Sequence, residues 1–213
     1  MIKDTTLSDK AYQALKEKII NLKSGTYLSA RQFASEIGMS YTPVREAFLR
    51  LQREGAIKQV PNVGFFVETV DLADLYQTYE VRECIEPFVL KKAFNRFTPE
   101  HIATMRKLVE KQAKALSSGK IMEYIRLDIE LHEIMFRIYN NKQLLELHRR
   151  IREQHMFCSN KIANTFNEEA LNEHRLLIDT IEAGNLENAL NILNAHIENA
   201  KQRMKEGYIS VIE

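Results

Sequence analysis

The feature that most restricts the fold of this chain is a series of short segments between residues 29 and 67. Two short helical stretches, over 29–37 and 42–54, are separated by a turn that begins at Gly38. A strand, a turn and a second strand follow directly, over 57–67. A helix-turn-helix followed by a hairpin predicts a winged helix-turn-helix unit.

Local signals indicate where these helices begin. Ser29, followed three residues later by Gln32, forms a capping box for the first short helix. Thr42 is expected to cap the second, with Pro43 at its first helical position. An amphipathic helix over 8–22 precedes both. The pattern therefore predicts a three-helix unit completed by a hairpin.

In such a unit the second short helix projects from the surface while the first supports it. Its N-terminal residues Tyr41, Thr42 and Arg45 would then contact base edges and phosphates in a major groove. The hairpin turn over 61–64 would reach phosphates or the minor groove. The pattern alone leaves one alternative open, a scaffold of this shape that binds another protein.

The distribution of charge favours DNA, although the net charge of the whole chain is only +1. Residues 1–70 contain ten Lys and Arg against seven Asp and Glu, which gives +3. Residues 71–213 contain twenty against twenty-two, which gives −2. A basic first part and a mildly acidic second part are typical of a DNA-binding unit joined to a second domain.

The run RQFASEIGMSYTPVREAFLRLQREGAI, followed by PNVGFFV, resembles the winged helix-turn-helix of GntR-family repressors. The resemblance implies a DNA-binding role, and it carries the family's DNA contacts onto Arg31, Tyr41, Thr42, Arg45 and Gly64. The sequence departs from the family at Tyr41, where arginine is common. Tyrosine cannot contact guanine bidentately as arginine does, so a different operator is expected.

The second part of the chain is expected to be entirely helical. Helices are predicted over 71–95, 98–118, 120–140, 142–160, 167–183 and 186–206, with Pro87 expected to kink or split the first. Only 7 glycines and 4 prolines occur in the whole chain, which favours long helices over a turn-rich β fold. The prediction is a mainly α protein with two domains. Residues 1–70 form the winged helix-turn-helix, and residues 71–213 form a helical bundle for metal and effector binding and for dimerisation.

Four residues of the second domain have the spacing of metal ligands. Asp128 and His132 lie one turn apart on an apolar helix face, and His174 and His196 also lie on apolar faces. Asn185, in the turn between the last two helices, is eleven residues from each of those two histidines. In an antiparallel hairpin both imidazoles therefore stand at the same height. One carboxylate and three imidazoles suit zinc, nickel, iron or manganese. The alternative is that these are hydrogen-bonded core histidines, and the other three, His101, His148 and His155, lack such partners.

The D-x3-H pair and the two later histidines are similar to the FCD effector domain of the FadR branch of the GntR family. This resemblance implies one divalent transition metal per chain, with zinc favoured, whose open positions bind a small organic-acid effector. Arg82, in VRECIE, matches an arginine that could bind an effector carboxylate, although an ion pair with Glu86 explains it nearly as well. Asn141 stands where the family often has asparagine, and helix capping explains it equally well.

Taken together, these features predict a ligand-responsive transcription regulator and not an enzyme. A homodimer is expected on double-stranded operator DNA, because paired half-sites match a two-fold operator. Two alternatives remain at this point: a regulator that senses the metal itself, and a metal-dependent hydrolase, for which no general base beyond the ligands is evident.

The location of the chain and the state of its cysteines can also be predicted. The first ten residues, MIKDTTLSDK, lack the apolar core of a signal peptide, and no stretch approaches the roughly 18 apolar residues of a membrane span. A cytoplasmic protein without membrane partners is therefore expected. Cys84 and Cys158 are expected to be free thiols there.

Overall fold

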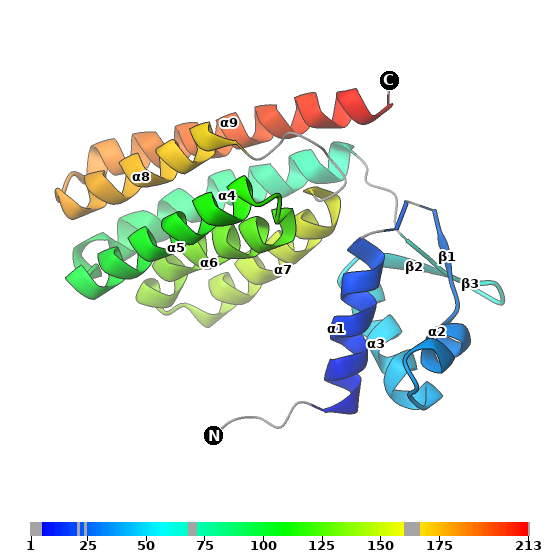
Figure 1. The fold of residues 1–213 in the computed structure, drawn as a ribbon. Helices are drawn as coiled ribbons and strands as arrows, with labels where there is room; N and C mark the ends of the chain where they lie inside the picture. Colours follow the sequence, from blue (N-terminus) through cyan, green and yellow to red (C-terminus); the bar gives the residue numbers. More distant parts are fainter. Residues whose placement is uncertain (1–5, 21, 24, 68–71, 160–166, 213) are drawn as a thin grey trace. The chain divides into compact units, whose positions relative to one another are not determined.

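The computed structural model describes residues 6–20, 22–23, 25–67, 72–159 and 167–212 (Figure 1). The chain divides into two compact units, Met1–Asp71 and Leu72–Glu213. The predicted boundary between residues 70 and 71 lies outside the described residues. No described helix is long and apolar enough to cross a membrane.

The first unit contains three helices and a small antiparallel sheet. The helices are α1 (Leu7–Ile20), α2 (Ala30–Glu36) and α3 (Tyr41–Arg53), and the strands are β1 (Tyr27–Leu28), β2 (Ile57–Val60) and β3 (Gly64–Val67). β2 and β3 form the predicted hairpin, and β1 pairs with the other edge of β3, so the strand order is β1-β3-β2. The winged helix-turn-helix is therefore confirmed, with one strand that the sequence pattern did not predict.

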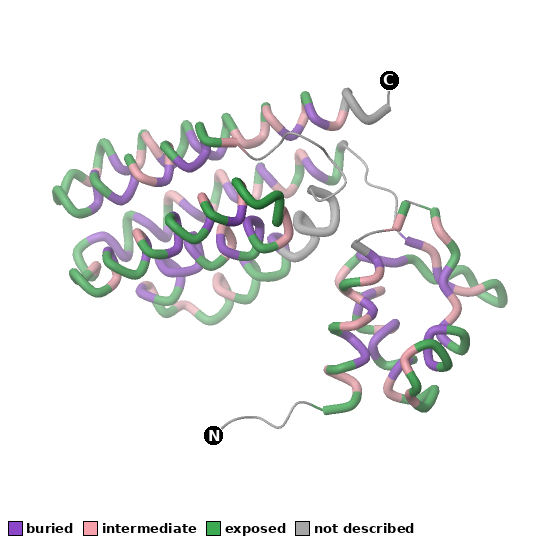
Figure 2. The backbone as a smooth tube through the Cα atoms, in the orientation of Figure 1, coloured by how far each residue is buried: buried purple, intermediate pink, exposed green. Residues whose placement is uncertain are grey.

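The buried face of α3 holds this unit together (Figure 2). Val44, Phe48 and Leu51 are fully buried at helical spacing. The ring of Phe48 lies 6.0 Å from that of Phe33 on α2 and 4.9 Å from that of Phe65 on β3, measured between centroids. One aromatic side chain thus joins the helix-turn-helix to the hairpin, while the opposite face of α3 stays exposed.

The helix caps agree with the sequence pattern only in part. Ser29 caps α2 by accepting a hydrogen bond from the Gln32 backbone at 3.3 Å, whereas the Gln32 side chain donates to Glu36 and does not close the capping box. The prediction that Thr42 caps α3 is wrong, because the helix begins two residues earlier, at Tyr41, and Ser40 is its N-cap. Pro43 fits at the third helical position, since the first four N–H groups of a helix have no intrahelical acceptor.

The second unit is a bundle of long helices. They are α4 (Leu72–Ala93), α5 (Pro99–Ser117), α6 (Ile121–Tyr139), α7 (Lys142–Ser159), α8 (Glu168–Glu182) and α9 (Leu186–Ile212), with the short 3₁₀ helix η1 (Phe94–Arg96) after α4. α4 packs against α6, α7 and α9, and α5 packs against α6 and α8. The predicted mainly helical architecture is confirmed, and the interior between these helices is lined by buried residues (Figure 2).

Two sequence predictions about this unit have a clear outcome. Pro87 lies inside α4 and does not split it. Packing of α4 against three other helices offsets the roughly 3 kcal/mol that an interior proline costs. Cys84 is a free, exposed thiol, and the side chain of Cys158 lies outside the described ones.

Candidate metal centre and nucleic-acid interface

Three helices of the bundle bring the four predicted ligands together. Asp128 and His132 come from α6, His174 from α8 and His196 from α9. One ligand atom from each lies within 4.8 Å of all the others. His174 Nε2 is 3.3 Å from His196 Nε2 and 3.3 Å from Asp128 Oδ1. The α8–α9 hairpin therefore places its two imidazoles at one height, as their equal distance from Asn185 predicts.

Carboxylates behind the imidazoles set their orientation. His132 Nδ1 lies 2.8 Å from Glu86 Oε2, and His196 Nδ1 lies 2.7 Å from Glu173 Oε2. Since an ionised carboxylate accepts hydrogen bonds, each Nδ1 carries the proton and each Nε2 keeps its lone pair for the site. This carboxylate–histidine arrangement is the one that fixes zinc-binding imidazoles in metalloproteins.

The polar atoms of the cluster fit a bound cation. All three imidazoles are buried, and His132 Nε2 and His174 Nδ1 have no hydrogen-bond partner among the described residues. Burial lowers the pKa of His174 well below its ordinary value, and burial also lowers the pKa of His196. Neutral imidazoles that present Nε2 beside a carboxylate are the donor set that a divalent transition metal requires.

Two buried arginines surround the carboxylates of the site. Arg152, on α7, forms an ion pair with Asp128 Oδ2, and Arg82 Nε, on α4, donates to Glu86 Oε1 at 2.7 Å. Burial alone would raise the pKa of Asp128, but the Arg152 guanidinium holds it well below the usual range. Arg82 and His132 likewise hold the pKa of Glu86 low against the effect of burial. Both carboxylates are therefore ionised.

The sequence does not identify three charged residues of the site, Glu86, Glu173 and Arg152, as parts of it. Glu86 was considered only as an ion-pair partner of Arg82, and Glu173 directly precedes His174 without any pattern that sets it apart. Arg152 lies on α7, a helix that supplies no ligand. Only the apolar residues around Arg152 in the sequence could indicate that it is buried. Its partner Asp128 is 24 residues away.

The two residues predicted to bind the effector, Arg82 and Asn141, have different surroundings in the structure. Arg82 is buried beside Glu86, yet its Nη2 has no hydrogen-bond partner among the described residues. Asn141 caps α7: its Oδ1 accepts hydrogen bonds from the backbone N–H groups of Gln143 and Leu144 at 3.1 and 3.2 Å. Capping accounts for Asn141, and its effector role stays a prediction.

Two of the remaining histidines, His101 and His148, are not part of the cluster. His101 accepts a hydrogen bond from the Thr98 backbone and completes a capping box at the start of α5. His148 is buried and stacks on Phe136 with 4.2 Å between ring centroids, and burial lowers its pKa to about 3. The side chain of His155 lies outside the described ones.

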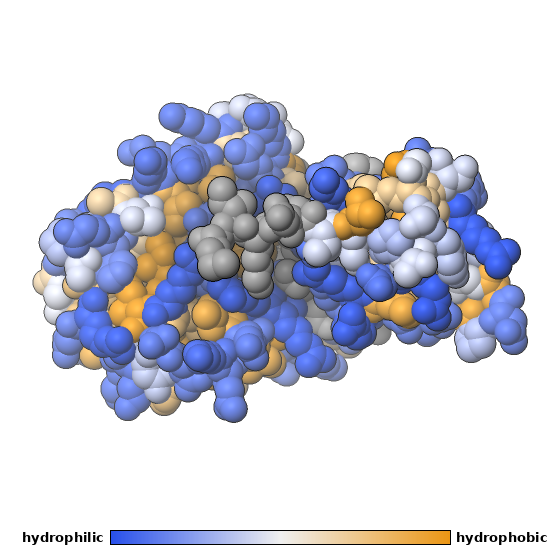
Figure 3. Space-filling model, turned by 90° about the horizontal axis from the view of Figure 1, so that it is seen from below, coloured by the Kyte–Doolittle hydropathy of each residue, from blue (hydrophilic) through white to orange (hydrophobic). Residues whose placement is uncertain are grey.

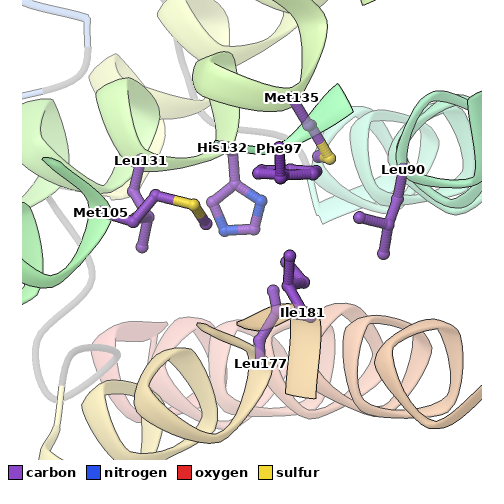
Figure 4. Close-up of a pocket in the computed structure, with 8 residues that line it drawn as sticks. All are labelled: Leu90, Phe97, Met105, Leu131, His132, Met135, Leu177 and Ile181. Atoms are coloured by element: carbon purple, nitrogen blue, oxygen red, sulfur yellow. The ribbon is translucent and has the colours of Figure 1, made fainter. Parts of the chain in front are cut away.

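A cavity with apolar walls lies beside the ligand cluster. His132 projects from α6 into a small cavity and faces Leu177 and Ile181 of α8 (Figure 4). Its other walls include Leu90, Phe97, Met105 and Met135. The cavity encloses about 20 Å³. The imidazole of His132 therefore belongs both to the ligand cluster and to an apolar surface.

The first unit presents the predicted DNA contacts on its surface. Arg31, Tyr41, Thr42 and Arg45 are exposed, and the Arg31 guanidinium lies 5.9 Å from the centroid of the Tyr41 ring. These residues belong to α2 and to the N-terminal end of α3, the part of a recognition helix that enters a groove.

Gly64, at the start of β3, has a structural role of its own. Its φ is +146°, and a Cβ atom there would lie 2.5 Å from a ring carbon of Tyr27. Any larger residue would force Tyr27 away from the hairpin. Whether Gly64 also contacts DNA stays a prediction.

Comparisons with known proteins agree with this geometry. Residues 7–67 match the model of the bacterial regulatory proteins of the gntR family, and residues 77–199 match that of the FCD domain. The chain is 27% identical over 205 residues, 92% of each protein, to the uncharacterized HTH-type transcriptional regulator YdhC of Bacillus subtilis.

Solved structures share the fold. McbR/YncC of E. coli superposes with a TM-score of 0.81 over 95% of this chain and 99% of that one, at 23% identity. The metal-free FCD domain of TM0439 superposes with a TM-score of 0.55 over 67% of this chain and 99% of that one, at 21% identity. Both likenesses extend to the helical unit that holds the cluster.

Proposed function

This chain belongs to the GntR family of bacterial transcription regulators and carries an FCD domain, and from that premise we propose that its DNA binding is controlled through a metal centre. In this proposal one divalent transition metal, with zinc favoured, binds Asp128, His132, His174 and His196. A small organic acid then binds at the metal and changes how the winged units of a homodimer meet operator DNA. The observation that carries the proposal is the convergence of four ligand atoms within 4.8 Å.

The protein's own residues would prepare this site for an anion. The metal, when bound, supplies a Lewis acid with coordination positions left open for an oxygen ligand. Glu86 and Glu173 hold two of the imidazoles in the tautomer that binds metal. Arg82 Nη2 and two of the Arg152 nitrogens, Nε and Nη1, have no partner among the described residues, so they are available to a carboxylate.

A homodimer is proposed from the demands of operator binding and from the surface of the helical unit. Apolar residues form a strip on one face of that unit, bordered by polar and charged residues (Figure 3). Exposed apolar side chains of the unit include Phe88, which is 46% exposed, and Leu176, which is 53% exposed. Apolar surface of this kind is typical of surfaces that bind another protein.

The exposed basic residues of the first unit predict a strong dependence of DNA binding on salt. Replacing Arg45 with alanine should weaken binding to all DNA sequences and reduce the slope of log K against log salt by about 0.9, if Arg45 contacts one phosphate. If Arg45 contacts a base instead, the substitution should weaken binding by about 1–3 kcal/mol, and only for DNA that has the preferred base at that operator position. Fluorescence anisotropy with labelled duplexes at several salt concentrations distinguishes the two.

Arg53 provides the matched control for this variant. It belongs to the same helix, but it lies at the C-terminal end, and its Nε donates to the Leu49 carbonyl oxygen. Arg53→Ala should leave the slope unchanged. Equal losses in both variants would contradict the proposed orientation of α3 on DNA.

The proposed control of DNA binding by a carboxylate is tested with DNA that the zinc-loaded, full-length chain selects from a random pool of sequences. Adding a small carboxylate should change the affinity for the selected DNA by about 5–150-fold, the usual range of allosteric coupling. Either direction of change supports the proposal. If chelation changes DNA affinity and no carboxylate does, the chain is a sensor of the metal itself. DNA affinity that responds to neither would overturn the proposal.

A further inference from the structure

The candidate metal centre has neighbours of two chemical kinds. Arg82 and Arg152 are paired with Glu86 and Asp128, and each arginine has guanidinium nitrogens without a partner among the described residues. Met105 of α5 and Leu177 of α8 line the cavity beside His132 (Figure 4). A ligand held at this centre would therefore have cationic groups for an anionic end and an apolar cavity for a hydrocarbon end.

We infer that the effector is a monocarboxylate with a short, unbranched hydrocarbon tail, and that the tail occupies the cavity beside His132. This inference rests on the proposed function, because the carboxylate must be held at the metal centre. The cavity encloses about 20 Å³. Since one water-sized group needs about 10–15 Å³, the cavity has room for one or two carbon atoms without rearrangement.

The composition of the cavity wall excludes a polar tail. Apart from His132, every residue that lines it has an apolar side chain, and two of them are methionines, Met105 and Met135. A hydroxyl or second carboxylate placed there would lose its hydration without gaining a hydrogen bond. Methionine side chains are flexible and adapt to a hydrocarbon group of irregular shape. The wall therefore favours alkyl groups over hydroxy acids and dicarboxylates.

A second cavity suggests how such a ligand enters. It has a volume of about 330 Å³, is open to solvent, and is lined by η1, the start of α5 and the end of α8. Phe97 and Ile181 line both cavities and form the wall that they share. Movement of these two side chains would connect the solvent with the space beside His132.

Calorimetric titration of the zinc-loaded, full-length chain with acetate, propionate, butyrate and pentanoate tests the inference. Each of the first two added methylene groups should strengthen binding about fourfold, the usual gain for burial of one methylene. Butyrate should thus bind about 15-fold more tightly than acetate, and pentanoate should gain little more. The hydroxylated analogue of butyrate, 3-hydroxybutyrate, should bind at least about tenfold more weakly than butyrate.

Two opposite substitutions at one position provide the matched variants. Leu177→Phe fills the cavity and should remove the dependence on chain length while acetate still binds. Leu177→Val enlarges the cavity and should move the optimum from butyrate to pentanoate. Leu177 is not a ligand and lines only the inner cavity, so zinc content should stay the same in both.

The outcomes separate this inference from the function on which it rests. Acetate binding with an affinity that chain length and Leu177 do not affect would overturn the inference and leave the proposed function intact. Absence of binding by every carboxylate to protein that contains zinc would overturn the proposed effector class, and the inference with it. A stepwise gain that ends at butyrate in the wild type, disappears in Leu177→Phe and extends to pentanoate in Leu177→Val would support both.

Discussion

Removal of the metal is expected to lower the midpoint of thermal unfolding of the full-length chain by about 10 °C. A ligand present at 100–1,000 times its dissociation constant stabilises the folded state by about 2.7–4.1 kcal/mol, and each kcal/mol corresponds to about 2–4 °C in a chain of this size. The Nε2 atoms of His174 and His196 lie 3.3 Å apart and His132 Nε2 has no hydrogen-bond partner among the described residues, so the metal supplies the partner that these buried atoms lack. Differential scanning calorimetry before and after dialysis against a chelator measures the effect.

Substitution of single ligands should reproduce this loss. His174→Gln and His196→Gln are each expected to reduce the metal content from about one per chain to near zero, because a neutral amide is a poor ligand for zinc. Elemental mass spectrometry of protein purified without a histidine tag gives the content directly.

His101→Gln is the matched control, since glutamine also serves as the third residue of a capping box and His101 lies outside the cluster. It should keep both the metal and the unfolding midpoint. Full metal content in the His174 and His196 variants, or its loss in the control, would contradict the four-ligand centre.

The ligand set could be predicted from the sequence because helical geometry is regular. Asp128 and His132 share a helix face at a spacing of four, and a short turn at Gly184 makes the heights of His174 and His196 calculable by counting. The hairpin over 57–67 could also be predicted, since its turn and strands are adjacent in sequence. Contacts of this kind depend on local rules alone.

The charged residues behind the ligands depend on how separate helices pack, which counting along one helix does not give. Glu86 on α4 reaches His132 on α6 across 46 residues, and Arg152 on α7 reaches Asp128 across 24. Arg82 could be singled out only through the family resemblance of VRECIE, and nothing in the sequence around Arg152 distinguishes it from the exposed arginines of the chain. The burial of the Arg152 side chain is what indicates that it belongs to the site.

A local rule also failed at the start of α3. Both Ser40 and Thr42 are residues that cap helices, and the pattern Thr42-Pro43 favoured the later one. The helix begins at Tyr41, which places Tyr41 and Thr42 in its first turn on the exposed face. Because serine and threonine both favour the N-cap position, residue types alone could not decide between Ser40 and Thr42.

Replacement of Arg82 by methionine is expected to destabilise the helical unit by about 3–5 kcal/mol. The Arg82–Glu86 pair is almost fully buried, with 2% and 0% of the two side chains exposed, and removal of one partner leaves an uncompensated charge in the interior. The matched control is Arg137→Met, which removes an exposed arginine from an i,i+4 pair with Glu133 and should cost no more than about 1 kcal/mol. Chemical denaturation of the metal-free variants measures both.

Glu86 makes the same pair part of the metal centre, because its two oxygens divide between Arg82 and His132. Glu86→Gln should therefore weaken metal binding by about 10–100-fold, as loss of such a carboxylate behind a ligand usually does. The double variant Arg82→Met/Glu86→Gln removes both charges at once, so it should be more stable than Arg82→Met alone while its metal affinity stays low. Purely additive losses of stability in the double variant would show that the two residues act independently. In that case Arg82 would have to be explained by the effector that it binds and not by the ion pair that it forms.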